Sequence, residues 1–297
     1  MQPTLLPAHD FGPPPGWAQF ALVDSPDIPE YPLHQVMDKV ILGDALQVLP
    51  KLPGESVDMV FLDPPYFLQL PRKRLVRWGV RTPVEGVDEA WDKFGSFAEY
   101  DAFLTRILQE VRRLMRPTAT LWAIGTYHNI FRVGKILQDL GFWILNDVIW
   151  VKPNPMPNWL NVRFTNATET LIWAVKDKGC KGYTFHHAAA RRYASGRVAR
   201  NIWEVPLCTG RERVKDASGR TLHPTQKPEA LLERVLAVST RPGDVVLDPL
   251  AGVGTTGVVA RRMGRQCIMV ERERRYVEAT LLRLQCINGV DDLVVTR

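Results

Sequence analysis

The stretch VVLDPLAGVGTTG, residues 245 to 257, decides which fold to expect. Its apolar beginning is typical of a buried strand, and three glycines spaced G-x-G-x-x-G (Gly252, Gly254 and Gly257) follow it. An amphipathic stretch comes next, and then a second apolar run that ends in Glu271. This order of strand, glycine turn, helix and strand is the βαβ unit that binds nucleotide cofactors, with the acid placed to contact a ribose hydroxyl.

Outward from this unit, the chain repeats the alternation of short apolar runs and amphipathic stretches. Strands are expected at about 39–43, 57–62, 118–124, 142–150, 170–175, 244–248 and 266–270. Helices are expected at about 45–51, 97–115, 128–139, 228–239, 255–263 and 273–288. The alternation predicts an α/β fold with a mostly parallel sheet and helices on both faces.

Three segments do not follow this alternation. Residues 1–37 contain eight of the 23 prolines and predict an extended N-terminal arm, in front of a domain that spans 38–297. Residues 67–95 and 176–222 are irregular and basic, which indicates insertions that emerge from the edge of the sheet.

The composition is typical of a soluble globular protein, with 45% hydrophobic and 24% charged residues in a chain of 297. A net charge of +6 favours a polyanionic partner. The four cysteines form no CxxC pair and the histidines lack partners at metal-binding spacing, so no metal site is predicted. There is no signal peptide and no apolar run of membrane-spanning length, so a cytoplasmic protein without a membrane partner is expected.

Four of the predicted strands end in an acid, at Asp44, Asp63, Asp248 and Glu271. Ligands of an open parallel sheet bind outside the carboxyl ends of its strands, so these acids are expected to surround one site. Helix capping is the alternative explanation for an acid after a strand, and Asp44 before ALQVL is the best candidate for it. Four acids in four strands favour the shared site.

The stretch VFLDPPYFLQL, residues 60 to 70, presents one of these acids beside an aromatic ring. The two prolines stop the strand after Asp63 and stiffen the chain before Tyr66. This arrangement suits an exocyclic amino group of a nucleobase, which is a poor nucleophile until fixed acceptors of its two N–H bonds localise its lone pair. The ring can stack on the base once the base has left the duplex.

Two cofactors fit the glycine motif. NAD would make the protein an oxidoreductase, but such a fold normally begins with this unit, whereas only 40 residues follow Gly257 here. Asp248 in front of the loop also disfavours a pyrophosphate. S-adenosylmethionine carries an adenosine, an amino-acid group and a positive charge, which suit the acids better.

The order of the motifs resembles that of a known family. DPPY early, HPTQKP at residues 223–228 and DPLAGVGTTG late is the order of the β-group DNA amino-methyltransferases, whose catalytic motif precedes the cofactor motif. The stretches WAIGTYHNIFRVG and LGFWILNDVIWVKPNPMPN resemble the cell-cycle-regulated adenine methyltransferases of that group. The resemblance spans roughly residues 38–288 and implies a circularly permuted, Rossmann-like fold that uses S-adenosylmethionine.

The resemblance also implies a function, which is methyl transfer to N6 of adenine in duplex DNA by base flipping. Adenine enzymes of the group have Asp at the position of Asp63, where enzymes acting on N4 of cytosine more often have Ser. N4 of cytosine is the alternative target, and a DNA-binding relative without activity is a further alternative. The suggested target sequence is GANTC.

The resemblance extends to individual residues of the motifs. Asp63, Pro64, Pro65 and Tyr66 are expected to be catalytic, and Lys227 is the expected partner of the cofactor's carboxylate. The residues expected to bind the cofactor are Asp44, Asp63, Thr225, Gln226, Lys227, Asp248, Gly252, Gly254, Thr255 and Glu271. The chain departs from the family pattern at Phe67, where Asn is common, and at Leu250-Ala251, where an aromatic is more usual.

Double-stranded DNA is the expected partner, and a homodimer is a candidate assembly. DNA-binding residues are expected in both basic insertions, where a solvated charged loop is the alternative interpretation. These residues are Arg72, Lys73, Arg74 and Arg77 in the first insertion and Arg191, Arg192, Arg211 and Arg213 in the second.

Overall fold

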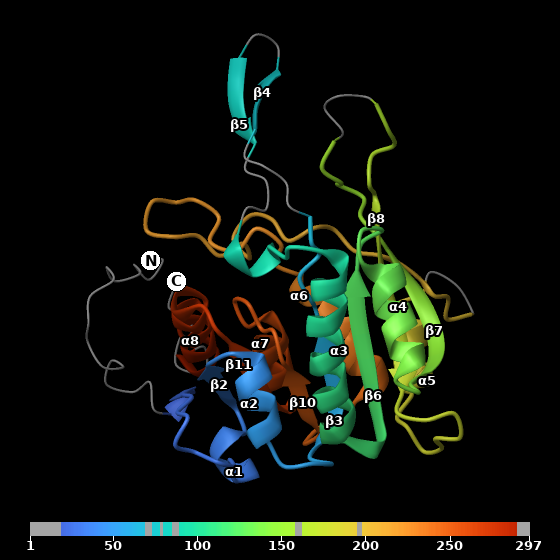
Figure 1. Ribbon diagram of the computed structural model, residues 1–297. Helices are drawn as coiled ribbons and strands as arrows, with labels where there is room; N and C mark the ends of the chain where they lie inside the picture. The colour runs from blue at the N-terminus through green and yellow to red at the C-terminus, as the bar shows by residue number, and fades with distance from the viewer. Residues whose placement is uncertain are drawn as a thin grey trace, which may run out of the picture.

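The computed structural model describes residues 19–68, 73–77, 80–84, 89–157, 162–194 and 198–289. Within these residues, nine strands form one sheet in the order β1-β2-β11-β10-β3-β6-β8-β7-β9, and helices cover both of its faces (Figure 1). The α/β fold predicted from the alternating pattern is confirmed.

Each strand and helix expected from the sequence is present within a few residues of its predicted bounds. The strands of the large sheet are β1 (Ala21–Val23), β2 (Lys39–Leu42), β3 (Val57–Leu62), β6 (Met115–Gly125), β7 (Trp143–Val151), β8 (Thr168–Val175), β9 (Ile202–Glu204), β10 (Val245–Asp248) and β11 (Gln266–Glu271). The helices are α1 (Leu33–Val36), α2 (Ala45–Val48), α3 (Phe97–Leu114), α4 (Ile130–Asp139), α5 (His187–Arg192), α6 (Glu229–Ser239), α7 (Thr255–Arg262) and α8 (Arg274–Gly289).

The strand order places a topological switch point between β10 and β3. From β10 the chain passes through α7 to β11 on one side, and from β3 it passes through α3 to β6 on the other. The pairs from β1 to β6 are parallel, whereas β8 runs antiparallel to β6 and β7. The carboxyl ends of β2, β3, β10 and β11 therefore meet at one edge, where ligands of such sheets bind. β3, which carries the expected catalytic motif, precedes β10, which carries the expected cofactor motif. The expected circular permutation is therefore present.

The alternation of side chains along the strands divides the core into two layers. On β3, Val60 and Leu62 pack in the layer of α2, α3 and α4, while Met59 and Phe61 pack in the layer of α6, α7 and α8. A strand covered on both faces needs no polar face, which explains the continuous apolar run from Met59 to Leu62. None of the described helices has the length and apolar character needed to cross a membrane.

The described part of the predicted N-terminal arm, residues 19–37, contains a strand that the sequence analysis missed. β1 pairs in parallel with β2 at the edge of the sheet, and Tyr31 donates a hydrogen bond of 2.7 Å to Asp24 just after β1. A strand of three residues is too short to show an alternating pattern. Residues 1–18 lie outside the described ranges.

The two predicted insertions also contain regular structure. In the first, β4 (Lys73–Arg77) and β5 (Val80–Val84) form an antiparallel hairpin beyond the end of the sheet at which β3 stops (Figure 1). In the second, α5 packs against α6, and β9 extends the sheet by pairing in parallel with β7. The expectation that 67–95 and 176–222 are irregular is therefore wrong for these elements, which are too short to show a clear period in the sequence.

Candidate functional site

A cavity of about 270 Å³ lies at the carboxyl ends of β2, β3, β10 and β11. It brings together nearly all of the residues that the sequence singled out as catalytic or cofactor-binding. Those lining it are Asp44, Asp63, Pro64, Pro65, Tyr66, Thr225, Gln226, Lys227, Asp248, Gly252, Thr255 and Glu271. Gly254, also expected to bind the cofactor, is instead the residue before the first turn of α7.

Asp63 at the end of β3 forms an ion pair with Lys227. The Nζ of Lys227 donates to Oδ2 of Asp63 over 2.7 Å and to the carbonyl of Thr225 over 3.2 Å. The other carboxylate oxygen of Asp63 is buried and accepts no hydrogen bond from the described residues. Burial raises the pKa of Asp63, and the ammonium of Lys227 opposes that rise.

The backbone and ring that follow Asp63 are anchored by side chains from other elements. The carbonyl of Pro65 accepts hydrogen bonds from the hydroxyl of Tyr100 (2.9 Å) and from Nδ2 of Asn129 (3.3 Å). The hydroxyl of Tyr66 donates to Oε2 of Glu169 over 2.9 Å, and Lys227 lies 4.9 Å from the centre of the Tyr66 ring. The motif is therefore fixed by tertiary contacts as well as by its prolines.

Phe67 adopts a left-handed backbone conformation with φ of 54°. Asn accepts this conformation more readily than Phe, which gives a physical reason for the Asn of the family pattern noted above. The carboxylate of Asp92 holds the turn by accepting hydrogen bonds from the N–H groups of Phe67 (2.7 Å) and Leu68 (2.8 Å). The Phe67 ring packs against Phe94 and Tyr100, with ring centres 5.6 Å and 5.9 Å apart.

The acids after β10 and β11 accept hydrogen bonds from their own loops. Asp248 accepts from the N–H of Leu250 (3.2 Å) and the hydroxyl of Thr256 (2.6 Å). Glu271 accepts from the N–H groups of Gly252 and Glu273, both over 2.7 Å. Burial raises the pKa of Asp248 and of Glu271 to about 7.

Asp44 differs from these two acids because it is exposed and caps a helix. Its Oδ1 accepts from the N–H of Leu46 over 2.8 Å at the start of α2. The sequence analysis considered both capping and a site role. The capping is confirmed, while Asp44 also lines the cavity and its role in binding stays a prediction.

The glycine loop lets the backbone approach the cavity closely. Gly252 has φ of 53°, and a Cβ there would lie 3.0 Å from Nε2 of His223. Gly254 has φ of 70°, and a Cβ there would lie 2.3 Å from Cγ2 of Thr280. Other residues would strain the loop at both positions, so the motif is required for its shape.

The HPTQKP segment is joined to the second insertion through Gln226. The Gln226 side chain accepts from the N–H of Val214 and donates to the carbonyl of Glu212, each over 2.9 Å. His223 is sandwiched in the cavity wall between the rings of Trp91 and Tyr276. Burial lowers the pKa of His223 to about 3, so its ring is neutral.

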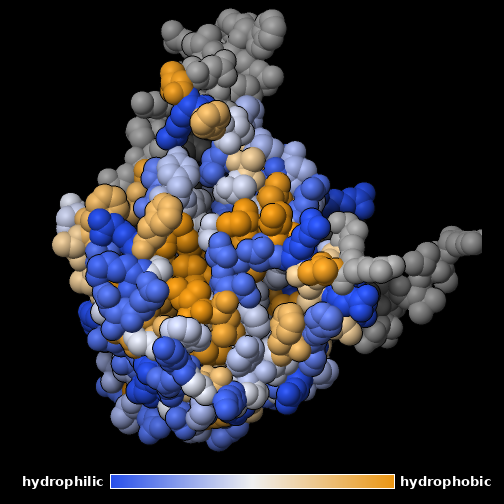
Figure 2. Space-filling view, turned by 90° about the vertical axis from the view of Figure 1, so that its right-hand side faces the viewer, coloured by the Kyte–Doolittle hydropathy of each residue, from blue (hydrophilic) through white to orange (hydrophobic). Residues whose placement is uncertain are grey.

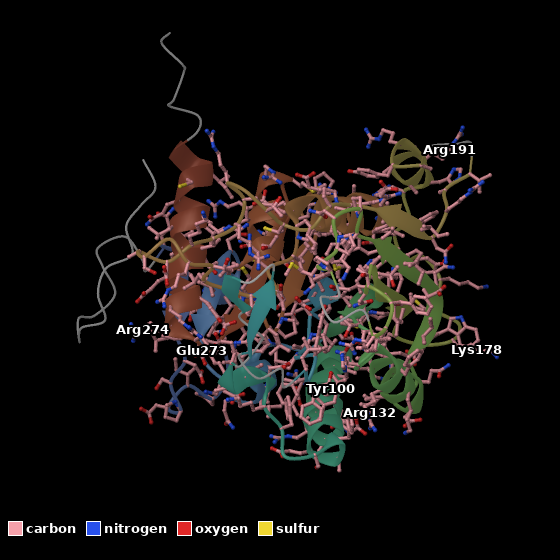
Figure 3. All side chains as sticks on the ribbon, turned by 90° about the horizontal axis from the view of Figure 1, so that it is seen from above. Tyr100, Arg132, Lys178, Arg191, Glu273 and Arg274 are labelled. Carbon is pink, nitrogen blue, oxygen red and sulfur yellow. The ribbon has the colours of Figure 1, made fainter. Side chains whose placement is uncertain are left out.

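The predicted DNA-binding residues occupy several different places. Arg191 and Arg192 are exposed on α5, and Arg191 lies at the outer edge of the molecule, far from Tyr100 beneath the catalytic motif (Figure 3). Arg211 is exposed, whereas Arg213 donates internally to the carbonyls of Cys208 and Pro224. Lys73, Arg74 and Arg77 lie on β4, and Arg72 lies outside the described residues. Across the described ranges, no group of three or more potential metal ligands was found.

The residues that the sequence analysis missed are those that hold the motif, including Asp92, Asn129, Lys152 and Glu169. One of them carried a usable signal. Glu169 is a charged residue near the start of the apolar strand TETLIWAV, and a buried acid in such a strand requires a partner.

Solved structures share this architecture. The PvuII DNA methyltransferase, described as cytosine-N4-specific, covers 86% of this chain and 91% of its own with a TM-score of 0.63, and at 20% identity this likeness concerns the fold alone. The M1.HpyAVI–SAM complex covers 82% of this chain and 98% of its own, with a TM-score of 0.59 and 25% identity. The fold and the arrangement of the motifs define the class of α/β methyltransferases.

Sequence similarity then identifies the family. Residues 57–282 match the N6/N4 family described as DNA methylase. The Type II methyltransferase M.HinfI of Haemophilus influenzae is 45% identical over 253 residues, which are 85% of this chain and 70% of that protein. The chain belongs to the N6/N4 DNA methylase family, which agrees with the resemblance found in the motifs and decides against an NAD-dependent oxidoreductase.

Proposed function

We propose that the protein transfers a methyl group from S-adenosylmethionine to the N6 amino group of adenine in duplex DNA, after the base has flipped out. The observation that carries the proposal is the carboxylate of Asp63. One oxygen is held by Lys227, and the other is a buried acceptor at the cavity without a partner among the described residues. A buried acceptor is costly until a donor reaches it, and an exocyclic N–H of a nucleobase is such a donor.

S-adenosylmethionine supplies a methyl group bonded to a positively charged sulfur. The cavity fits this cation, because Asp63, Asp248 and Glu271 all lie in its wall. Glu271 is expected to receive the ribose hydroxyls, and Gly252 leaves room for the ligand beside it. The presence of SAM in the M1.HpyAVI complex, at 25% identity, supports the same cofactor here.

Lys227 suits a double role in this proposal. Two of the three N–H bonds of its ammonium are directed to Asp63 and to the carbonyl of Thr225. The third is available for the carboxylate of the cofactor. The same cation thus opposes the rise that burial causes in the pKa of Asp63, and it binds the amino-acid end of the cofactor.

The chemistry requires two acceptors for the amino group. Asp63 supplies one, and the carbonyl of Pro64 supplies the other, because the carbonyl of Pro65 is taken by Tyr100 and Asn129. Together they localise the nitrogen lone pair for attack on the methyl carbon. The nitrogen becomes cationic during transfer and loses its proton afterwards, so Asp63 need not be a strong base. Tyr66 stacks on the flipped base.

The test is to methylate mixed genomic DNA with the purified protein, digest it to nucleosides and resolve them by mass spectrometry. N6-methyladenine is the expected product. N4-methylcytosine alone would overturn the choice of base and leave the mechanism intact, whereas no methylated nucleoside would overturn the function. Modification-aware sequencing of the same DNA tests GANTC as the target, and similarity to a Type II methyltransferase favours a role in restriction–modification.

We further propose that the protein acts in the cytoplasm as a homodimer, with the basic insertions against DNA. Figure 2 shows apolar side chains gathered on the face at the β7 end of the sheet. Trp143 on β7 is 45% exposed and Ile202 on β9 is 59% exposed, both at this edge. Sedimentation of the wild type and of Ile202→Glu tests the assembly, and a monomeric wild type would contradict it.

A further inference from the structure

A second ion pair lies behind the ring of Tyr66. Glu169 accepts the Tyr66 hydroxyl with Oε2 over 2.9 Å, and its Oε1 lies 3.3 Å from Nζ of Lys152. Glu169 is on β8, and Lys152 directly follows β7. Only 10% of the Glu169 side chain and 7% of the Lys152 side chain are exposed, so the pair is almost completely removed from water.

The sheet does not need this ion pair for its own stability. β7 and β8 are joined by a backbone ladder from Trp143 to Val151, and residues of both strands pack in an apolar core. Apolar side chains in place of a buried ion pair often leave a protein equally stable or make it more stable, because the charges give up their hydration. A buried ion pair at this place therefore suggests that its role is to hold a neighbouring group in position.

The contacts of Tyr66 indicate what is positioned. The backbone beside the ring is held through Pro65, and one face of the ring lies against Lys227 at 4.9 Å from its centre. These contacts do not fix the tilt of the Tyr66 ring. The tilt is set at the hydroxyl end of the ring, where Glu169 accepts the hydrogen bond. Lys152 in turn fixes Glu169, since both carboxylate oxygens then have a donor.

We infer that Glu169 and Lys152 are positioning residues, which orient the ring of Tyr66 for stacking on the flipped base. The inference rests on the proposed function, because it assigns the pair to the base-binding side of that site. Neither residue contacts the reacting atoms. Their hydrogen-bonded link to the site is the Tyr66 hydroxyl, and the charge of Glu169 adds to the rise that burial causes in the pKa of Asp63.

A double-mutant cycle tests this assignment. Tyr66→Phe removes the hydroxyl, and Glu169→Gln removes the charge of its acceptor. Each change is expected to lower kcat by about tenfold, with the KM for S-adenosylmethionine unchanged within about twofold. If the pair acts through Tyr66, the double variant loses no more than the more impaired single variant. Glu204→Gln, at an exposed acid on neighbouring β9, is the matched control and should keep the wild-type kcat.

Glu169→Gln leaves Lys152 buried without its counter-charge, which can destabilise the fold. A second variant therefore separates a loss of kcat caused by instability from one caused by a misplaced Tyr66 ring. Glu169→Leu with Lys152→Met replaces the pair by apolar side chains of similar size. This variant should match the Tm of the wild type and still lose kcat to the level of Tyr66→Phe. Wild-type kcat in this folded variant, or multiplicative losses in the cycle, would overturn the inference. If DNA treated with the wild-type protein contained no methylated nucleoside, the proposed function itself would be wrong.

Discussion

The two halves of the site differ in where their polar groups find partners. In the β10 half, formed by β2, β10 and β11, the acids accept hydrogen bonds from residues at most 19 positions away along the chain. In the β3 half, formed by β3, β6, β7 and β8, the partners lie between 25 and 164 positions away. They are Lys227 for Asp63, Glu169 for Tyr66, Tyr100 for Pro65 and Asp92 for Phe67.

This difference between the two halves shows whether a sequence motif includes the groups that hold its functional side chains. VVLDPLAGVGTTG includes both Asp248 and the Thr256 hydroxyl that donates to it, so this half carries its own support. DPPY contains the groups proposed to meet the base but none of the side chains that hold them. Geometry in the β10 half depends on the loop sequence, while geometry in the β3 half depends on the whole fold.

The largest expected effect comes from removing one acid in each half of the site, Asp63 in the β3 half and Glu271 in the β10 half. Asp63→Ala should lower methyl transfer by about 10²–10³-fold or more, since it removes an acceptor that acts on the reacting nitrogen. Glu271→Ala should instead raise the Kd for S-adenosylmethionine by about 10–100-fold, because two backbone N–H groups lose their acceptor beside the ligand. Calorimetry and single-turnover kinetics on both variants measure the two quantities separately.

A matched variant sharpens this test. Asp63→Asn keeps the shape of the side chain and one carbonyl oxygen, so it should retain more activity than Asp63→Ala. The division of the site into two halves would be wrong if Asp63→Ala lost cofactor affinity as severely as Glu271→Ala.

A smaller effect is expected in the pH dependence of stability. Burial raises the pKa of Asp248 and of Glu271 to about 7 in the folded protein. The folded state therefore binds protons more tightly than the unfolded state, and this stabilisation is lost as the pH rises through 7. Both groups together contribute about 2–3 kcal/mol between pH 6 and pH 8, so the Tm of the ligand-free protein should fall by roughly 3–5 °C.

The control for this slope is the double variant Asp248→Asn with Glu271→Gln, scanned by calorimetry at the same pH values. Its Tm should change much less with pH than that of the wild type. Asp63→Asn should alter the slope less, because Lys227 opposes the effect of burial on the pKa of Asp63. Equal slopes in the wild type and the double variant would contradict the assignment to these acids.

The same distinction explains how far the sequence could predict the structure. The long central elements were predictable because burial on both faces of the sheet produces continuous apolar runs and burial of helices produces a period of 3.6. The acids and glycines of the site were predictable because each follows such a run. β1 and β9 were not, since three residues cannot show a period.

The supporting side chains could not be predicted for a different reason. Asn129 and Glu169 become neighbours of the motif only when α4 packs on the sheet and β8 pairs within it. The spacing of these residues in the sequence does not predict that. The left-handed turn at Phe67 was also hidden, because Asp92 holds it from another segment. The Asn of the family pattern at this position is consistent with a left-handed backbone, but the pattern does not show that Asp92 holds the turn.

The smallest expected effect concerns two arginines of the second insertion that sequence alone treated alike. Arg211 is exposed, while Arg213 donates to the carbonyls of Cys208 and Pro224 and so fastens its segment to HPTQKP. Arg211→Gln should reduce the slope of log K for DNA against log salt by about 1, with a few-fold loss of affinity. Arg213→Gln removes the same charge from the same segment but should leave that slope unchanged. It should instead lower stability by about 1–2 kcal/mol, because two partly buried carbonyls lose a charged donor, and it should weaken cofactor binding. Salt titrations of DNA binding and thermal melts of both variants measure these effects. Equal changes in slope would mean that only total charge matters here and that the internal bonds of Arg213 carry no separate role.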